Sequence, residues 1–109
     1  MKTIYQDAGS RAAQIRRASD AVRDVFGFAM EEFREQTRRR VLFFPRMTFS
    51  VEMHRIARPI TDEEIAQLVC RDRSTVLYYY KTYKNEVEVN REFAEAALTV
   101  RKTLELERS

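Results

Sequence analysis

The chain has 109 residues, which is enough for one domain with a single hydrophobic core and too few for two. Hydrophobic residues make up 44% of it and charged residues 34%, proportions that exclude an intrinsically disordered chain. Only two Gly and two Pro are present, and because a β-sandwich or barrel needs many turns built from these residues, an all-β fold is also excluded. The composition predicts a single all-α domain spanning residues 1–109.

The positive charge is concentrated in the middle of the chain. Residues 37–84 contain ten basic and five acidic side chains, whereas residues 85–109 contain four basic and six acidic ones. The middle of the chain is therefore the part suited to a polyanion such as nucleic acid. A solvated basic face without a partner is the alternative, and the run Arg38-Arg39-Arg40 favours the polyanion.

Several other classes of protein are disfavoured. One Cys and one His are too few for a metal site, and a lone Cys cannot form an internal disulfide. No segment approaches the length of a membrane span, and the first residues lack the apolar core of a signal peptide. No set of residues has catalytic spacing. We therefore expect a cytoplasmic protein that is not an enzyme, with no cofactor and no membrane partner.

In chain order, residues 1–10 are expected to be flexible. Apolar residues at three- and four-residue spacing then predict a helix from about Arg11 to Phe26, and Gly27 supplies its left-handed C-terminal residue. A short helix over about 29–36 follows, with Met30 and Phe33 facing inward.

The arginine run falls on the next connection. A third helix begins near Pro45, because proline can open a helix but cannot continue one. We expect Phe49, Met53 and Ile56 to face inward from it, and Arg58-Pro59-Ile60 to end it.

Residues 61–87 have the order of a helix-turn-helix. Thr61 and Glu64 have the spacing of a capping box that opens a short helix with Ile65, Leu68 and Val69 on one face. The pattern is interrupted at Cys70-Arg71. Asp72 then caps a longer helix whose inward positions are Val76, Tyr80, Tyr83 and Val87.

Residues 88–109 predict a C-terminal helix. Phe93, Ala97, Val100 and Leu104 fall in line along it. It either packs back on the domain or continues as an arm. The count of predicted helices is about six.

In a helix-turn-helix, the second helix enters the major groove and its N-terminal residues face the base edges. Here these residues are Asp72, Arg73, Ser74 and Thr75, whose groups can donate, accept or touch a thymine methyl. Arg71 and Arg73 add positive charge, and Lys81 and Lys84 lie where they can reach the DNA backbone. The alternative is that Asp72 is only a cap and that Ser74 and Thr75 are ordinary first-turn residues.

The stretch from Glu64 to Val76, which contains Arg71-Asp72-Arg73-Ser74-Thr75, resembles the signature of a known DNA-binding domain. This is domain IV, the C-terminal, TrpR-like helical domain of the bacterial chromosomal replication initiator DnaA. The resemblance covers about residues 15–105. Within it, Val22 to Phe28 is similar to the family's opening helix and glycine, Arg38-Arg39-Arg40 to its basic loop, and Pro45-Arg46 to a Pro-Arg pair at the next helix start.

The resemblance implies a recognition helix in the major groove of double-stranded DNA and a basic loop in the adjacent minor groove. It implies that Arg38 enters the minor groove, where the potential is strongly negative in A/T-rich DNA. It further implies that Arg40 and Arg46 support phosphate or base contacts, and that Asp72, Ser74 and Thr75 contact bases or backbone. We assign Arg39 to phosphate.

The chain departs from the family in several places. Arg73 replaces the signature histidine, Cys70 stands where glycine is favoured in a turn that is one residue shorter, and Tyr78 replaces a small residue. There is no phosphate-binding glycine loop and no room for the family's ATPase module, so no nucleotide cofactor is expected. We expect either an excised domain or a free-standing relative.

Other features have simpler interpretations. His54 is expected on the surface or in helix packing, Cys70 as a small turn residue, and the tyrosines from Tyr78 to Tyr83 in packing rather than in stacking on bases. Two further functions stay open. One is a dimeric helix-turn-helix transcriptional regulator, and the other is a protein-interaction module that keeps the fold. The oligomeric state is not predicted.

Overall fold

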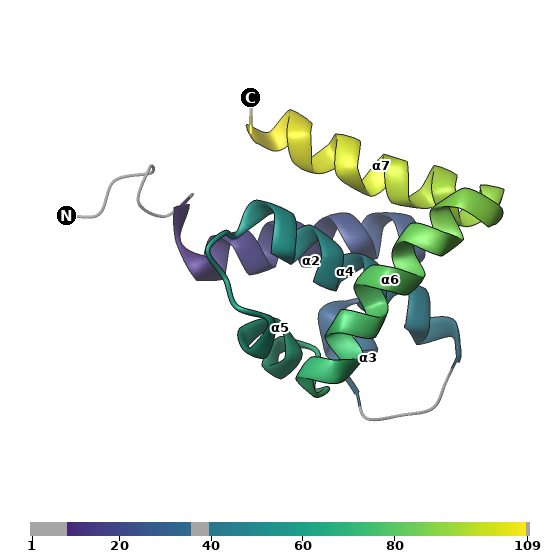
Figure 1. The fold of residues 1–109 in the computed structure, drawn as a ribbon. Coiled ribbons are helices and arrows are strands. Elements are labelled where there is room, and N and C mark those ends of the chain that lie inside the picture. Colours follow the sequence, from purple (N-terminus) through teal and green to yellow (C-terminus); the bar gives the residue numbers. More distant parts are fainter. Residues whose placement is uncertain (1–8, 36–39, 109) are drawn as a thin grey trace.

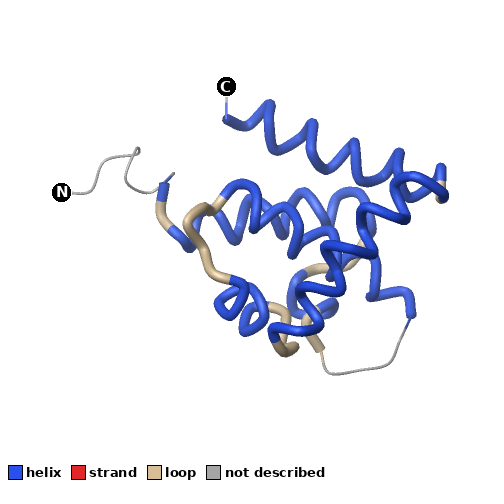
Figure 2. Tube along the Cα trace, viewed as in Figure 1, coloured by secondary structure: helices blue, strands red, loops and turns tan. Residues whose placement is uncertain are grey.

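The computed structural model describes residues 9–35 and 40–108 (Figures 1 and 2). Within these ranges every regular element is a helix, which confirms the all-α prediction. The expectation for residues 1–8 and the positions of Arg38 and Arg39 lie outside the described residues. The elements in chain order are α2 (Arg11–Phe26), α3 (Met30–Phe33), the 3-10 helix η1 (Arg40–Leu42), α4 (Phe43–Ile56), α5 (Asp62–Leu68), α6 (Arg73–Val89) and α7 (Arg91–Arg108).

The first described helix, α2, has the bounds that the apolar spacing predicts. Ser10 caps it by accepting a hydrogen bond from the Ala13 amide at 3.1 Å. Gly27 ends it at a φ of 84°, in the left-handed region that glycine adopts without a steric penalty. The inner face of α2 packs against α4 and α7.

The central helix is α4, which contacts α2, α5, α6 and α7. It begins at Phe43, two residues earlier than predicted, because the 3-10 turn of η1 leads directly into it. Pro45 is then the third helical residue, a position whose amide has no partner within the helix, so its missing N–H costs nothing. Phe49 and Met53 are fully buried and Ile56 partly buried, as expected.

The second predicted helix is shorter than expected. Helix α3 covers only Met30–Phe33 instead of about 29–36. The Arg46 side chain donates hydrogen bonds to the carbonyls of Phe33 and Glu35, which would accept from later amides if the helix continued. Phe33 itself is fully buried, with its ring centroid 5.3 Å from that of Phe49.

Helices α5 and α6 and their turn lie where the capping residues predict them. The Thr61 hydroxyl accepts from the Glu64 amide at 3.1 Å, and the Asp72 carboxylate accepts from the Thr75 amide at 2.8 Å. Between the two helices Cys70 has a φ of 56°, the left-handed conformation that favours glycine. On α6 the most buried tyrosine is Tyr79, which the spacing did not select, while Tyr80 and Tyr83 are partly buried. Val87, which was also expected to face inward, is exposed, so that expectation was wrong.

The last helix packs back on the domain and does not form an arm. Chain direction changes at Asn90, whose side-chain oxygen accepts from the Phe93 amide at 3.0 Å. The four residues predicted in line, Phe93, Ala97, Val100 and Leu104, are all buried. Figure 1 shows α7 returning from the end of α6, and it packs against both α6 and α2.

Candidate nucleic-acid interface

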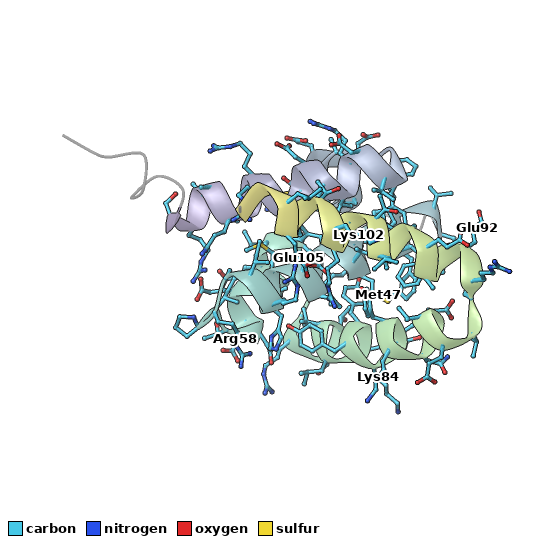
Figure 3. All side chains as sticks on the ribbon, turned by 90° about the horizontal axis from the view of Figure 1, so that it is seen from above. Met47, Arg58, Lys84, Glu92, Lys102 and Glu105 are labelled. Carbon is cyan, nitrogen blue, oxygen red and sulfur yellow. The ribbon has the colours of Figure 1, made fainter. Side chains whose placement is uncertain are left out.

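The outer face of α6 is exposed along the helix. Val76 and Tyr79 face the core, and the residues about half a turn away from them are exposed. The exposed set is polar or charged except for Leu77, Tyr78 and Val89, and consists of Ser74, Leu77, Tyr78, Lys81, Lys84, Asn85, Glu88 and Val89. In Figure 3 Lys84 points away from the body of the protein, whereas Met47 of α4 lies inside it. One long helix therefore presents a free face, with hydroxyl and ammonium groups on it.

The start of α6 is held by its cap. Asp72 Oδ1 accepts from the Thr75 amide, and the backbone and side-chain hydrogen bonds to Thr75 lower the pKa of the Asp72 carboxyl. The Asp72 carboxylate therefore acts as a cap in this structure, as the simpler interpretation of the sequence held. Ser74 is exposed and Thr75 is half-buried beside it.

Arg73 at the start of α6 forms an ion pair with α5. Its Nε lies 3.4 Å from Glu63 Oε1 on α5, and both side chains are more than half exposed. An ion pair this exposed is weak. The Arg73 guanidinium could therefore leave Glu63 and bind another anion with little loss of free energy.

Arg46 is turned into the protein. It is only 5% exposed, its Nε donates to the Phe33 carbonyl at 2.7 Å, and its Nη2 lies 3.5 Å from the Glu35 carbonyl. The Arg46 side chain is therefore buried on backbone carbonyls in this structure, although the resemblance implied a supporting contact to DNA. Its hydrogen bonds hold the chain just before the arginine run.

Arg71 binds the same part of the backbone from the helix-turn-helix. Its Nη2 donates to the Glu35 carbonyl at 3.1 Å, and its Nη1 donates to the Cys70 carbonyl at 2.8 Å. Arg46 and Arg71 thus meet at Glu35 from α4 and from the turn before α6. Glu35, three residues before the arginine run, is therefore bonded to the turn that precedes α6.

Arg40 is the only member of the arginine run among the described residues, and it is exposed at the start of η1. Leu42 anchors η1 in the core. Phe43 follows, with its ring centroid 6.5 Å from that of Tyr78 and 5.7 Å from that of Tyr79. Phe43, three residues after Arg40, therefore adjoins the second turn of α6, while Glu35 is bonded to Arg71 just before α6 begins.

A polar cluster beneath the helix-turn-helix ties three helices together. The Tyr80 hydroxyl donates to Asp62 Oδ1 at 2.9 Å, and burial, followed by this carboxylate, raises the pKa of Tyr80. The His54 ring lies 4.9 Å from the Tyr80 ring, and its Nε2 accepts from Arg58 at 2.9 Å. His54 therefore has a role in helix packing.

The described residues form neither a metal-ligand cluster nor a membrane-spanning helix. No group of three or more His, Cys, Asp or Glu side chains in the described part of the chain is placed to hold a metal ion. Among residues 9–35 and 40–108, no helix is both long and apolar enough to cross a membrane.

The sequence analysis did not select Leu77 for the exposed face, and it expected Tyr78 in packing, whereas Tyr78 is 57% exposed. Both lie at helical spacing from Ser74 and Lys81, so the signal was present in the sequence.

No protein-family model, curated protein or solved structure matches the chain.

Proposed function

We propose that this protein binds double-stranded DNA in a sequence-specific manner, with α6 in the major groove and the arginine run directed to the adjacent minor groove. The mode would be that of a replication initiator's box-binding domain. The observation that carries the proposal is the exposed face of α6, which opens on Ser74 and continues through Lys81 and Lys84. A helix with such a face is the element that fits the major groove.

The proposed roles follow the placement of each side chain. Ser74, Thr75 and Arg73 at the start of α6 read base edges, because the N-terminal residues of a recognition helix lie deepest in the groove. Lys81 and Lys84 bind phosphates. The Asp72 carboxylate keeps α6 capped.

The arginines divide into two groups. Arg38, Arg39 and Arg40 are proposed to contact DNA. Arg46 and Arg71 are proposed to be positioning residues, because their hydrogen bonds hold the Glu35 carbonyl, three residues before the run, close to the turn that precedes α6. Contacts in the major groove by α6 and in the minor groove by the arginine run require a fixed distance between these two segments. Arg46 and Arg71 would help to maintain that distance.

The test uses two lysine variants that remove the same charge from different faces. Lys81→Ala should weaken binding to every duplex and reduce the slope of log K against log salt by about 0.9. Lys102→Ala, on α7 away from Lys84 in Figure 3, should leave both quantities unchanged. If the two variants bind alike and have the same salt dependence, α6 is not part of the DNA interface.

A third variant tests base reading. Ser74→Ala should cost about 1–3 kcal/mol on the preferred duplex and little on a scrambled one. If the protein prefers no duplex at all, the proposal fails and a protein-interaction module becomes the better description. If the preferred DNA consists of two half-sites about one helical turn apart, a dimeric transcriptional regulator is favoured.

A further inference from the structure

An apolar side chain lies in the middle of the polar face of α6. Leu77 is 40% exposed, although the core residues Val76 and Tyr79 are its neighbours in the sequence. Ser74 precedes it by three residues and Lys81 follows it by four, so the three side chains are neighbours on the helix surface. Leu77 thus sits between a hydroxyl and an ammonium group.

Tyr78, the next residue along α6, is also exposed, but its ring contacts another helix. It lies 6.5 Å from the ring of Phe43 at the start of α4. Its hydroxyl gives it a polar end. Leu77 lies about 100° further round the helix, has no polar atom, and projects from the part of α6 that the proposed function places in the groove.

The surroundings of Leu77 decide between two kinds of partner. An apolar patch on a protein partner would call for further exposed apolar groups beside Leu77. The exposed positions three and four residues away carry Arg73, Ser74 and Lys81. The remaining neighbour, Tyr80, is partly buried and its hydroxyl donates to Asp62. A DNA major groove offers one apolar group, the C5-methyl of thymine, within a strongly anionic surface. The Leu77 side chain is complementary to the thymine methyl, and the flanking Ser74 hydroxyl and Lys81 ammonium are complementary to the polar and anionic groups around it.

We propose that Leu77 contacts a thymine methyl group and is therefore a specificity-determining residue. This inference rests on the proposed function, since it requires α6 to enter the major groove. The inference specifies one base of the preferred DNA site: a thymine that faces the second turn of α6. Ser74 would read the adjoining base, and Lys81 the phosphate on the other side.

The test replaces thymines of the preferred duplex, one at a time, by deoxyuridine, which pairs identically and lacks only the methyl group. Wild type should lose about fourfold in affinity at one or two positions, the factor expected when one methyl group is no longer buried. Leu77→Ala should bind the thymine duplex more weakly and be insensitive to the same replacements. Leu77→Met, which keeps an apolar contact, should keep the sensitivity.

The matched control is Leu98→Ala, which removes the same atoms from an exposed leucine on α7, 53% accessible to solvent. It should behave as wild type on both duplexes. Circular dichroism should show Leu77→Ala folded, because the side chain is on the surface. The inference is overturned if Leu77→Ala remains as sensitive to deoxyuridine as wild type, or if no replacement weakens the wild-type protein. Failure of the proposed function looks different, since no duplex would then be preferred, and both ideas would fall.

Discussion

A buried carboxylate joins α7 to the centre of the protein. Glu52 of α4 has no exposed surface, and its Oε2 accepts from Arg101 of α7 through Nε at 3.2 Å and Nη2 at 2.9 Å. Its Oε1 accepts two hydrogen bonds from Arg55 at 3.0 and 2.8 Å. Burial alone would lower the pKa of Arg101, but the hydrogen bonds and charge of Glu52 raise it.

Replacing Arg101 by Met tests how much this contact stabilises the fold. The change keeps the apolar stem and leaves Glu52 Oε2 buried without a donor. Breaking a fully buried ion pair costs about 3–5 kcal/mol. Since Arg55 stays in place and Arg101 is itself partly exposed, we expect a smaller loss here, about 2–3 kcal/mol. Adding Glu52→Met should recover much of the loss, because no buried charge then remains.

Urea unfolding followed by circular dichroism measures the effect as a shift of the midpoint at constant slope. Arg91→Met is the matched control, because Arg91 forms an ion pair with Glu95 at 3.4 Å while 93% exposed. It should change the free energy of unfolding by less than about 0.5 kcal/mol. Equal effects of Arg101→Met and Arg91→Met would refute the reasoning about the buried carboxylate.

Three further predictions concern the candidate interface. Arg46→Met should lower the free energy of unfolding by about 1–3 kcal/mol, because the Phe33 carbonyl loses its donor. Arg40→Ala should leave the free energy of unfolding unchanged and weaken duplex binding. Equal stability of the two variants in urea titrations would contradict this prediction. The lowered pKa of Asp72 means that its carboxylate stabilises the fold above its ordinary pKa of 3.8 and that this contribution is lost as the pH falls through the lower folded value. Asp72→Asn, which keeps a cap without a charge, should therefore flatten the acid side of a melting-temperature profile, and an unchanged profile would count against the cap. Glu63→Gln should tighten duplex binding about two- to fivefold by releasing Arg73 and removing an anion, and weaker binding in the same titration would show that the ion pair positions Arg73 for contact.

Local rules predicted much of the fold. The bounds of α2 follow from apolar spacing and from Gly27, and the starts of α5 and α6 follow from Thr61 and Asp72. Each of these signals involves residues within a turn or two of one another, so the sequence alone carries them. The polar face of α6 could be predicted for the same reason.

The parts that could not be predicted depend on contacts between distant residues. Arg46 belongs to the basic set by sequence, yet it is buried because two carbonyls eleven and thirteen residues away need donors. Arg71 bonds a carbonyl thirty-six residues away, and Glu52 meets Arg101 across forty-nine. Charge alone does not tell an arginine that binds backbone carbonyls from one that faces a phosphate.

Base specificity is the central claim, and selection from a random duplex pool tests it most directly. Rounds of binding to the full chain at near-physiological salt should enrich one short motif that contains A·T pairs, bound about a thousandfold or more tighter than scrambled duplex. Recovered sequences that share no motif, and that bind no better than the starting pool, would contradict the claim.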